Sequence, residues 1–486
     1  MIYQSTRSEH LLASGAEAIL QGIASDGGLY VPRGGELPRL SLREVVERTP
    51  MALAEYVMGA LLPDFAELPQ LVKNAYADRF SAEDLTPLVP VGDSYVLELF
   101  HGPTSAFKDV ALCMLPQLIT AAKRKLGVTD EIVILTATSG DTGKAALEGF
   151  HDVDGTKIIV FYPEEGVSCV QKAQMVTQEG ANVKVCAVCG NFDDAQSAVK
   201  QIFAACSGSD ALRELGVRLS SANSINIGRL VPQTVYYFKA YGDLVRRGTI
   251  QVGDAVDFVV PTGNFGNILA GYLAKKMGLP VGRLVCASNQ NDVLTDFLRT
   301  GRYDRNRPFH KTISPSMDIL ISSNLERLLY LETCDTALVS ALMQQLSQNG
   351  CYQLPVAPLR RIQEVFSGCR CTEAETMQTV REVWDAHGYL MDPHTAVAWY
   401  AAQHTERKNP TVVLSTASAY KFPAAVLRAL GKETGVNEFD DIAALHACTG
   451  VTVPKNLQEL ASRSVLHSDV RCKEDLLAYV LDQIGE

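Results

Sequence analysis

Lys108 lies at the start of a predicted helix, where the amine of a lysine could act as a nucleophile. Residues 94–100 predict a strand, Gly102–Ser105 predicts a turn, and residues 110–125 have the apolar spacing of a helix. The positive end of the helix dipole disfavours a cation at this position. Burial acts in the same direction, and both effects favour the neutral amine that Schiff-base chemistry needs. Taken alone, however, an exposed lysine in a first helical turn is the simpler interpretation.

A glycine-rich loop, residues 261–267 (Pro-Thr-Gly-Asn-Phe-Gly-Asn), follows a predicted strand and precedes a predicted helix. Gly263 and Gly266 let backbone amides approach an anion, and the helix N-terminus adds partial positive charge. The loop therefore predicts a phosphate cradle, although a tight strand-to-helix turn would use the same residues. It matches neither the Walker motif nor the dinucleotide-binding glycine pattern.

A second strand-to-helix loop occupies residues 138–144 (Thr-Ser-Gly-Asp-Thr-Gly-Lys). The Walker motif would require glycine where Thr138 stands and serine or threonine where Ala145 stands, so this interpretation fails twice. The hydroxyls of Ser139 and Thr142, together with free backbone amides, suit the carboxylate of an amino acid.

A third polar segment, residues 220–229, carries Ser224, Asn226 and Arg229 just before and within a predicted helix. Hydroxyl and amide donors together with one guanidinium make a good receiver for a doubly charged phosphate ester. An ordinary helix cap with a solvent-facing arginine explains the same pattern about equally well.

The elements that must position these loops alternate between strand and helix, which predicts a parallel sheet covered by helices on both faces. The expected strands are residues 131–136, 157–162, 183–188, 255–260, 284–287 and 412–414. The expected helices are residues 140–150, 171–180, 193–205, 268–277 and 324–349, whereas residues 300–318 predict a long loop. The last strand is expected to return to the sheet, and the tail beyond residue 435 is expected to be mostly helical.

Length and composition limit the classes of protein to which the chain can belong. A chain of 486 residues suggests two or three domains, and 47% hydrophobic with 20% charged residues is typical of a globular protein. The net charge of −11 argues against a nucleic-acid or anionic-membrane surface. We find no apolar run long enough to cross a membrane, and residues 1–10 lack the apolar core of a signal peptide, so a cytoplasmic location is expected.

The cysteines and histidines do not predict a metal site. Twelve cysteines without a secretory signal suggest reduced thiols. Cys186 and Cys189 have a metal-like spacing, but they lie in or beside a predicted strand and have no second ligand pair nearby. None of the nine histidines forms a ligand-spaced pair.

Together, the loops resemble those of pyridoxal 5'-phosphate (PLP) enzymes of the tryptophan-synthase-β fold type, also called fold type II. The resemblance is closest to the long form of the threonine synthase family, on residues 102–109 (Gly-Pro-Thr-Ser-Ala-Phe-Lys-Asp) and from Asp26–Pro32 to Ser415–Ser418. It implies an α/β fold with two sheet domains. It also implies an N-terminal threonine-synthase domain (1–92), a PLP-binding core (93–435, with a smaller subdomain at about 110–230) and a C-terminal helical extension (436–486).

The same resemblance implies roles for individual residues. Lys108 would bind PLP covalently and then move protons, and the hydroxyl of Thr416 would contact the pyridine nitrogen. The PLP phosphate would be held by the loop residues Gly263, Asn264, Phe265, Gly266 and Asn267. The substrate would be held by Ser139 and Thr142 at its carboxylate and by Ser224, Asn226 and Arg229 at its phosphate.

Three further residues of the resembling segments have no clear role. Asp141 stands where many members of the fold type have asparagine at the phenolic oxygen of PLP. A carboxylate there would be repelled unless a proton is shared or a cation lies nearby. Residues 314–318 and 391–396 also resemble family segments, but Asp392 and His394 are assigned no catalytic role.

The activity that the resemblance implies is that of a carbon–oxygen lyase acting on phosphates. O-phospho-L-homoserine and water would give L-threonine and phosphate, the last step of threonine biosynthesis. One alternative is a PLP-dependent phospho-lyase that converts O-phosphothreonine to 2-oxobutyrate. A non-catalytic amino-acid-binding regulator is disfavoured, because Lys108, the loop 263–267 and Arg229 are all intact. We expect a monomer or homodimer with a small-molecule substrate and neither nucleic-acid nor membrane partners.

Overall fold

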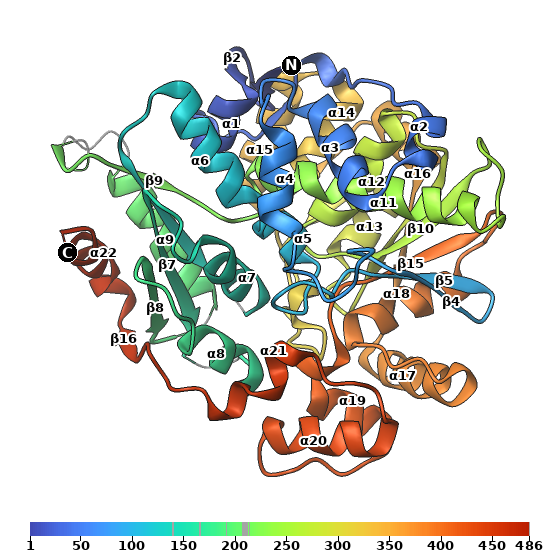
Figure 1. Ribbon diagram of the computed structural model, residues 1–486. Coiled ribbons are helices and arrows are strands. Elements are labelled where there is room, and N and C mark those ends of the chain that lie inside the picture. The colour runs from blue at the N-terminus through green and yellow to red at the C-terminus, as the bar shows by residue number, and fades with distance from the viewer. Residues whose placement is uncertain (139, 165–166, 191, 207–211, 213, 486) are drawn as a thin grey trace.

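The structure, a computed structural model, describes residues 1–138, 140–164, 167–190, 192–206, 212 and 214–485, and it contains two large sheets (Figure 1). The six-stranded sheet has the order β14 (Phe366–Arg370), β11 (Val281–Ser288), β10 (Val256–Pro261), β15 (Thr411–Ser415), β5 (Ser94–Glu98) and β4 (Leu88–Val91). Its neighbouring strands are parallel except for the antiparallel pair β4–β5. The late strand β15 returns to the middle of this sheet, as predicted.

The second large sheet has five parallel strands. Their order is β16 (Asp469–Arg471), β8 (Val183–Val188), β7 (Thr156–Pro163), β6 (Glu131–Ala137) and β9 (Val217–Ser220). The middle strands are buried on both faces and are accordingly rich in valine and isoleucine. The mixed α/β architecture with two sheets confirms the predicted fold class.

The N-terminal segment forms a third, small antiparallel sheet, in which β1 (Ile2–Ser5) lies between β2 (Ser8–Ser14) and β3 (Tyr30–Pro32). Four helices follow in this segment: α1 (Gly15–Gln21), α2 (Leu42–Glu47), α3 (Pro50–Leu61) and α4 (Leu68–Tyr76). These helices pack against α6 (Met114–Leu126) and α11 (Ile227–Arg246) of the central part of the chain. The N-terminal segment therefore supports the helix that carries Arg229.

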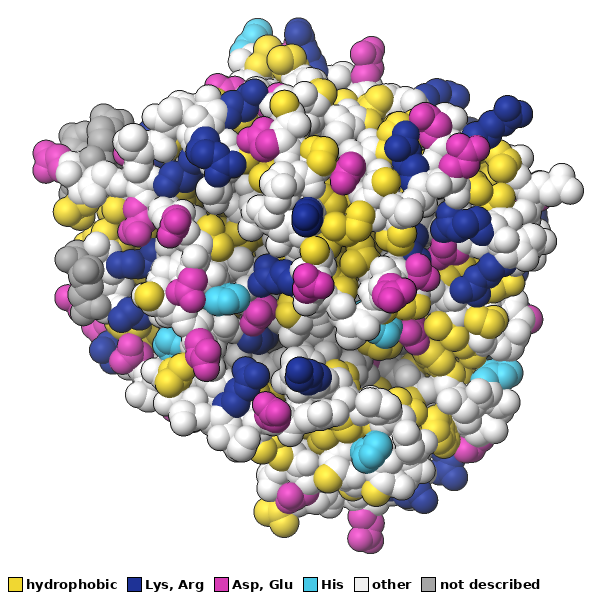
Figure 2. All heavy atoms as spheres, viewed as in Figure 1, with side chains coloured by type: hydrophobic (Ala, Val, Ile, Leu, Met, Phe, Trp, Pro, Cys, Tyr) yellow, Lys and Arg dark blue, Asp and Glu magenta, His cyan; other side chains and the backbone are white. Residues whose placement is uncertain are grey.

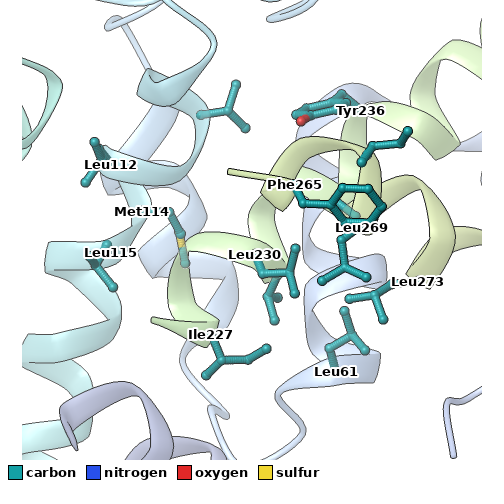
Figure 3. Packing of buried hydrophobic residues seen from close by; sticks show 14 of the residues in the cluster. Leu61, Leu112, Met114, Leu115, Ile227, Leu230, Tyr236, Phe265, Leu269 and Leu273 are labelled. Carbon is teal, nitrogen blue, oxygen red and sulfur yellow. The ribbon is translucent and has the colours of Figure 1, made fainter. Parts of the chain in front are cut away.

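The remaining helices surround the two large sheets, except those of residues 423–458, which lie at one end of the molecule (Figure 1). They are α5 (Lys108–Leu112), α7 (Asp141–Phe150), α8 (Cys169–Val176), α9 (Phe192–Cys206), α12 (Gly266–Lys276), α13 (Val293–Thr300), α14 (Leu325–Thr333), α15 (Thr336–Asn349), α16 (Val356–Val365), α17 (Glu373–His387), α18 (Pro393–His404), α19 (Pro423–Ala429), α20 (Glu438–Thr449), α21 (Lys455–Gln458) and α22 (Leu476–Gly485). A two-stranded sheet joins β12 (Arg302–Asp304) to β13 (Cys351–Gln353). The largest apolar core lies where α3, α5, α6, α11 and α12 meet (Figure 3).

No helix in the described residues is long and apolar enough to cross a membrane. On the face shown in Figure 2, acidic and basic side chains are interspersed. This face therefore has no broad basic patch of the kind that binds nucleic acid.

Four predicted segments differ from the structure. The helix expected over 110–125 is divided into α5 and α6, because Pro116 has no N–H to donate to the carbonyl of Leu112. The helix expected over 324–349 is interrupted at Cys334, which has a left-handed backbone. The expected long loop 300–318 contains the short strand β12, and the tail expected to be helical contributes β16 to a sheet.

Helices α5 and α7 approach each other closely, and this contact sets the spacing between Lys108 and Asp141, their first residues. The carbonyl oxygen of Leu112, which Pro116 leaves without its usual helical donor, lies 2.1 Å from where a Cβ of Gly149 would be. A backbone atom cannot move aside as a flexible side chain can. Glycine is therefore required at position 149.

Gly149→Ala should destabilise the protein. We expect the free energy of unfolding to fall by about 1 to 3 kcal/mol, the usual cost of overpacking a tight contact, as measured by denaturant unfolding. Gly59→Ala is the matched control, because a Cβ at this helical position would meet only Leu68 Cδ2 at 3.6 Å. The control should be neutral or stabilising, and equal losses in the two variants would contradict the proposed contact.

Candidate active site

Lys108 is the first residue of α5 and directly follows the loop that connects β5 to this helix. The loop is fixed to the following part of the site by a hydrogen bond from Phe107 N to Thr416 O (2.8 Å). The side chain of Lys108 is 12% exposed, and its Nζ lies 3.4 Å from Ser316 Oγ and 3.7 Å from Asp141 Oδ2. Burial is the main cause that lowers the pKa of Lys108 to about 8. The attraction of Asp141 opposes this effect, and the charges of Lys421 and Arg229 add to it. Lys108 is thus a largely buried, readily deprotonated amine.

Asp109 holds the turn in front of Lys108 closed. Its buried carboxylate accepts hydrogen bonds from Thr104 N (2.9 Å) and Thr104 Oγ1 (2.5 Å). Burial raises the pKa of Asp109 to about 6, although these hydrogen bonds act in the opposite direction. Within this closed turn, Ser105 has a positive φ of 59°. The sequence Thr-Ser-Ala-Phe-Lys-Asp therefore forms a turn that is closed by its own hydrogen bonds, and this turn directs the side chain of Lys108 into the protein.

The glycine-rich loop ends β10 and begins α12, as predicted. A Cβ on Gly263 would lie 2.6 Å from Ser316 O, so glycine permits a second loop to pass close by. Phe265 caps α12 with a left-handed backbone (φ 60°), while its ring packs in the core 5.7 Å from the ring of Phe366. Phe265 can therefore offer a ligand its backbone rather than its side chain.

Asn267, at the first turn of α12, has an unusual set of partners. Its Oδ1 accepts hydrogen bonds from Tyr236 Oη (2.6 Å) and Tyr237 Oη (2.9 Å). Its buried Nδ2 has no hydrogen-bond partner within the described part of the chain. A buried donor without a partner is costly, and a phosphate at this helix N-terminus would satisfy it. The loop thus fits the phosphate of PLP.

A segment that the sequence analysis missed, Ser322–Asn324, lies beside this loop. Ser322 Oγ donates to Gly263 O (2.9 Å), and Asn324 N donates to Asn264 O (3.1 Å). The neighbouring Ser323 shares a hydrogen bond with Ser224 (3.3 Å between their Oγ atoms). The glycine loop and the segment around Ser224 are therefore brought together. A polar Ser-Ser-Asn run directly before an apolar helix was the available signal.

Arg229 is buried (2% exposed) in the first turn of α11, which contradicts the alternative of a solvent-facing arginine. Its Nη1 donates to Ala222 O, whereas its Nε has no partner in the described residues. Burial lowers the pKa of Arg229 to about 10. A buried guanidinium without a carboxylate favours the arrival of an anion.

Asn226, predicted to contact the same anion, has a structural role in addition. It is the N-cap of α11, where its Oδ1 accepts from Gly228 N (2.9 Å) and its Nδ2 donates to Ile19 O (2.9 Å). Both ends of the side-chain amide are thus engaged. Its direct contact with substrate stays a prediction.

The predicted carboxylate loop lies at the start of α7. Thr138 Oγ1 accepts hydrogen bonds from Gly140 N (3.0 Å) and Gly143 N (2.9 Å), which fixes the turn. Thr142 is partly exposed in the first helical turn, and Ser139 lies outside the described residues. Thr416 is buried at the end of β15, and no hydrogen bond of its hydroxyl is found in the described chain. The contacts predicted for these residues with cofactor and substrate stay predictions.

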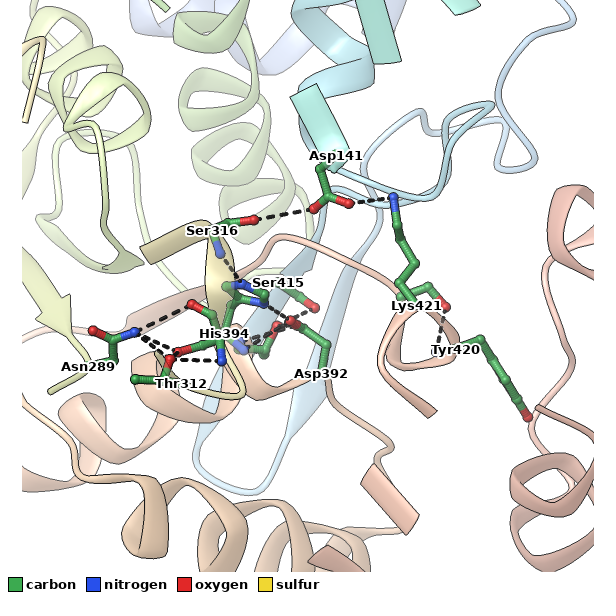
Figure 4. A network of polar contacts seen from close by, with 12 residues as sticks. Asp141, Asn289, Thr312, Ser316, Asp392, His394, Ser415, Tyr420 and Lys421 are labelled. Atoms are coloured by element: carbon green, nitrogen blue, oxygen red, sulfur yellow. Dashed lines mark hydrogen bonds and ion pairs between the residues drawn. The ribbon is translucent and has the colours of Figure 1, made fainter. Parts of the chain in front are cut away.

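A polar network that was not predicted from the sequence supports Asp141 (Figure 4) and contacts Lys108 through Ser316 Oγ. Lys421 Nζ bonds Asp141 Oδ1 (2.7 Å), and Ser316 Oγ donates to Asp141 Oδ2 (3.4 Å). Ser316 N in turn donates to His394 Nε2 (3.1 Å), and His394 Nδ1 lies 2.6 Å from Asp392 Oδ2. His394 therefore holds the Ser316 loop in place. For Lys421, the signal was a single lysine within an otherwise apolar run.

Comparison with known proteins identifies the relatives of this chain. Residues 81–417 match the family model described as pyridoxal-phosphate dependent enzyme, residues 2–92 match threonine synthase N terminus, and residues 395–473 match threonine synthase, C-terminal. Threonine synthase from Pseudomonas aeruginosa is 40% identical over 442 residues, which is 88% of this chain and 90% of that protein. Threonine synthase-like 1 from Homo sapiens is 42% identical over 441 residues and 87% of this chain, but the match spans only 58% of that relative's length.

Solved structures agree with these relatives. PLP-bound threonine synthase from Brucella melitensis superposes with a TM-score of 0.88 at 38% identity, covering 100% of both chains. Yeast threonine synthase superposes with a TM-score of 0.86 at 33% identity, covering 100% of this chain and 98% of that one. The cofactor is therefore PLP, and the unpartnered Asn267 Nδ2 beside a glycine loop fits its phosphate.

Lys108→Ala should remove both the visible absorption band of the protein loaded with PLP and its turnover. The reason is that no other amine would be in place for the covalent bond to the cofactor. Absorbance spectroscopy after gel filtration and an assay of phosphate release measure the two effects. Lys125→Ala, on the exposed side of α6, should retain both properties. A Lys108 variant that kept the absorption band and the turnover would contradict the assignment of Lys108 as the PLP-binding lysine.

Proposed function

This chain belongs to the threonine synthase family of PLP-dependent enzymes, and we propose that it converts O-phospho-L-homoserine and water into L-threonine and phosphate. Such a substrate carries a phosphate ester, a carboxylate and an amine, so its site needs two separate anion receivers beside a reactive amine. The observation that carries the proposal is the buried Arg229, whose charge acts on Lys108 and which has no carboxylate partner among the described residues.

Each part of the site has a task in this proposal. Bound PLP supplies an electron sink that stabilises negative charge at the carbon atoms of the substrate. The N-terminus of α12 holds the phosphate of the cofactor, while Arg229 and Ser224 hold the phosphate of the substrate. The N-terminus of α7, with Thr142, holds the carboxylate of the substrate.

Lys108 moves the protons. Once it is released by the amine of the substrate, its neutral amine can take a proton from Cα, and a proton then leaves Cβ as phosphate departs from Cγ. A proton is then added at Cγ, which becomes the methyl group of threonine. The hydroxyl of water adds at Cβ while its proton goes to the released phosphate, and a proton returns to Cα from the same amine. A pKa of about 8 suits this exchange, because the amine can gain and lose a proton near neutral pH.

A phospho-lyase that converts O-phosphothreonine to 2-oxobutyrate remains the second candidate. The similarity to threonine synthase-like 1 favours keeping it, because that relative is about as similar to this chain as the threonine synthases are. The two enzymes would share the amine, the cofactor and both anion receivers. They would differ in whether water is added at Cβ.

We also propose the arrangement that accompanies this activity. Residues 1–92 would form an N-terminal domain, residues 93–435 the catalytic core, and residues 436–486 a C-terminal extension. The protein would act in the cytoplasm as a monomer or homodimer.

An end-product assay tests the reaction. The PLP-loaded protein would receive O-phosphohomoserine and O-phosphothreonine in separate reactions, and threonine, 2-oxobutyrate and phosphate would be quantified. We expect threonine and phosphate in equal amounts from O-phosphohomoserine. If phosphate and 2-oxobutyrate were formed without threonine, the protein would be the phospho-lyase.

Substitution of Arg229 tests the phosphate receiver. Arg229→Gln should raise the KM for O-phosphohomoserine and weaken competitive inhibition by inorganic phosphate, each by about 10- to 100-fold, the value of one or two hydrogen bonds to a charged group. The steady-state kinetics would be measured over a range of phosphate concentrations.

Asn226→Ala removes a helix cap and should lower the free energy of unfolding by about 1 kcal/mol, so the stability of both variants would be measured beside their kinetics. Equal sensitivity of Arg229→Gln and wild-type enzyme to phosphate would contradict the proposed receiver.

A further inference from the structure

Lys421 is a fully buried lysine at the end of the short helical turn Ala419–Lys421, which directly precedes α19. Its Nζ makes an ion pair with Asp141 Oδ1 (2.7 Å) and donates to Thr104 O (3.0 Å). It therefore links α7 to the turn in front of Lys108, although the three segments are far apart in the sequence (Figure 4).

Asp141 lies between two lysines, and its two oxygens have different surroundings. Oδ1 is fully engaged, because it accepts from Lys421 Nζ and from Gln171 Nε2 (2.9 Å). Oδ2 faces Lys108 Nζ at 3.7 Å and Ser316 Oγ at 3.4 Å. Burial alone would raise the pKa of Asp141, but the charges of Lys421 and Lys108 hold it below its usual value.

We propose that Lys421 is a positioning residue, the fixed counter-ion of Asp141, and that it leaves the amine of Lys108 free of a permanent ion pair. The proposal rests on Lys108 being the cofactor lysine of the proposed function. It concerns the charge of this amine and is independent of the reaction that follows.

Lys108 must lose its proton to react, so it cannot serve as the permanent partner of a buried carboxylate. A buried carboxylate with no other partner would hold a proton on the lysine facing it, because an amine is the stronger base of the two. Lys421 removes this constraint, since its charge attracts Asp141 and repels a proton on Lys108.

The other groups around Lys108 do not replace Lys421. Arg229 also disfavours the charged amine, but it forms no ion pair with Asp141 within the described residues. Ser316 is neutral, and the imidazole of His394 contacts the backbone of Ser316 rather than Asp141. The resemblance to fold type II places Asp141 near the phenolic oxygen of PLP, where a carboxylate needs a nearby cation. Lys421 supplies one.

The structure offers a matched control in Lys239. This lysine is equally buried (3% exposed), and its Nζ bonds Asp243 Oδ2 (2.7 Å) and Thr86 O (3.0 Å). The two lysines thus have nearly the same partners and distances. They differ in that Lys239 also lies 3.9 Å from Asp84 Oδ2 and Asp243 also pairs with Arg246, whereas the carboxylate of the Lys421 pair faces Lys108. Their loss should therefore affect stability similarly and the amine of Lys108 differently.

The test measures the amine of Lys108 directly in the full-length chain freed of PLP. Acetic anhydride would be applied from about pH 6 to about pH 11, a range that covers the shifted and ordinary pKa of lysine, and acetylation of Lys108 would be quantified by peptide mass spectrometry. In Lys421→Met, the labelling profile should move to higher pH by about one unit or more, which makes labelling about tenfold slower near neutral pH. In Lys239→Met, the profile should stay where it is in the wild type.

A second variant distinguishes charge from structure. Lys421→Met combined with Asp141→Asn removes both partners of the ion pair, which is better tolerated than the removal of one. In this double variant, the labelling profile should return to the pH range of the wild type or move to lower pH. Asp141→Asn alone should move the labelling profile to still lower pH, because Lys421 then repels the charged amine of Lys108 and no carboxylate compensates.

Two results would overturn the proposal. One is an unchanged labelling profile in Lys421→Met. The other is a double variant whose profile stays at the same high pH as that of Lys421→Met. If Lys421→Met did not fold, Asp141→Asn and the double variant would still decide, because equal profiles in those two would show that Lys421 has no effect on Lys108. Labelling as proposed together with the absence of threonine synthesis would leave this inference intact and reject only the proposed reaction.

Discussion

The arrangement of the site depends on a local excess of buried positive charge. Lys108 and Lys421 flank the buried carboxylate of Asp141, and the buried Arg229 adds a third positive charge that acts on Lys108, within a chain whose net charge is −11. Buried cations without full compensation are costly in a medium of low dielectric constant. Anionic ligands relieve this cost, so binding of the cofactor and of a phosphorylated substrate should add to the stability of the folded state. In the proposed function, an acidic protein can thus bind two phosphate groups, because the receivers are local and buried.

The fold creates this charge cluster by bringing the ends of distant strands to one place. The carboxyl ends of β5, β6, β10 and β15 lead into the loops of Lys108, Asp141, Gly263 and Thr416. Ligands of open parallel sheets bind at such ends. The N-terminal segment adds a brace through the fully buried Arg327, which bonds Tyr30 O, Asn324 Oδ1 and Ile225 O. It thereby ties β3 to both segments that flank the proposed substrate phosphate.

Features carried by contiguous residues could be predicted from the sequence, whereas features made by distant partners could not. The turn before Lys108, the glycine loop and the alternating buried strands all have local patterns, and the structure contains each of them. Lys421 pairs with a residue 280 positions earlier (421 minus 141), and no local pattern encodes such a pairing. The strands β9, β14 and β16 were missed because they are short and mix polar with apolar residues. The need for a shared proton or a nearby cation at Asp141 was predictable from chemistry, although the residue that supplies the cation was not.

The two buried lysine–aspartate pairs show why position matters more than strength. Lys421–Asp141 and Lys239–Asp243 have the same 2.7 Å separation and similar burial. From their bond geometry alone, both ion pairs would be expected to add little or nothing to the net stability of the fold. Only the first lies beside an amine that must change its charge during a reaction, since Asp141 Oδ2 faces Lys108. A pair that adds little to stability can therefore determine the protonation state of its neighbour, and this gives a physical reason for placing a lysine in an otherwise apolar run.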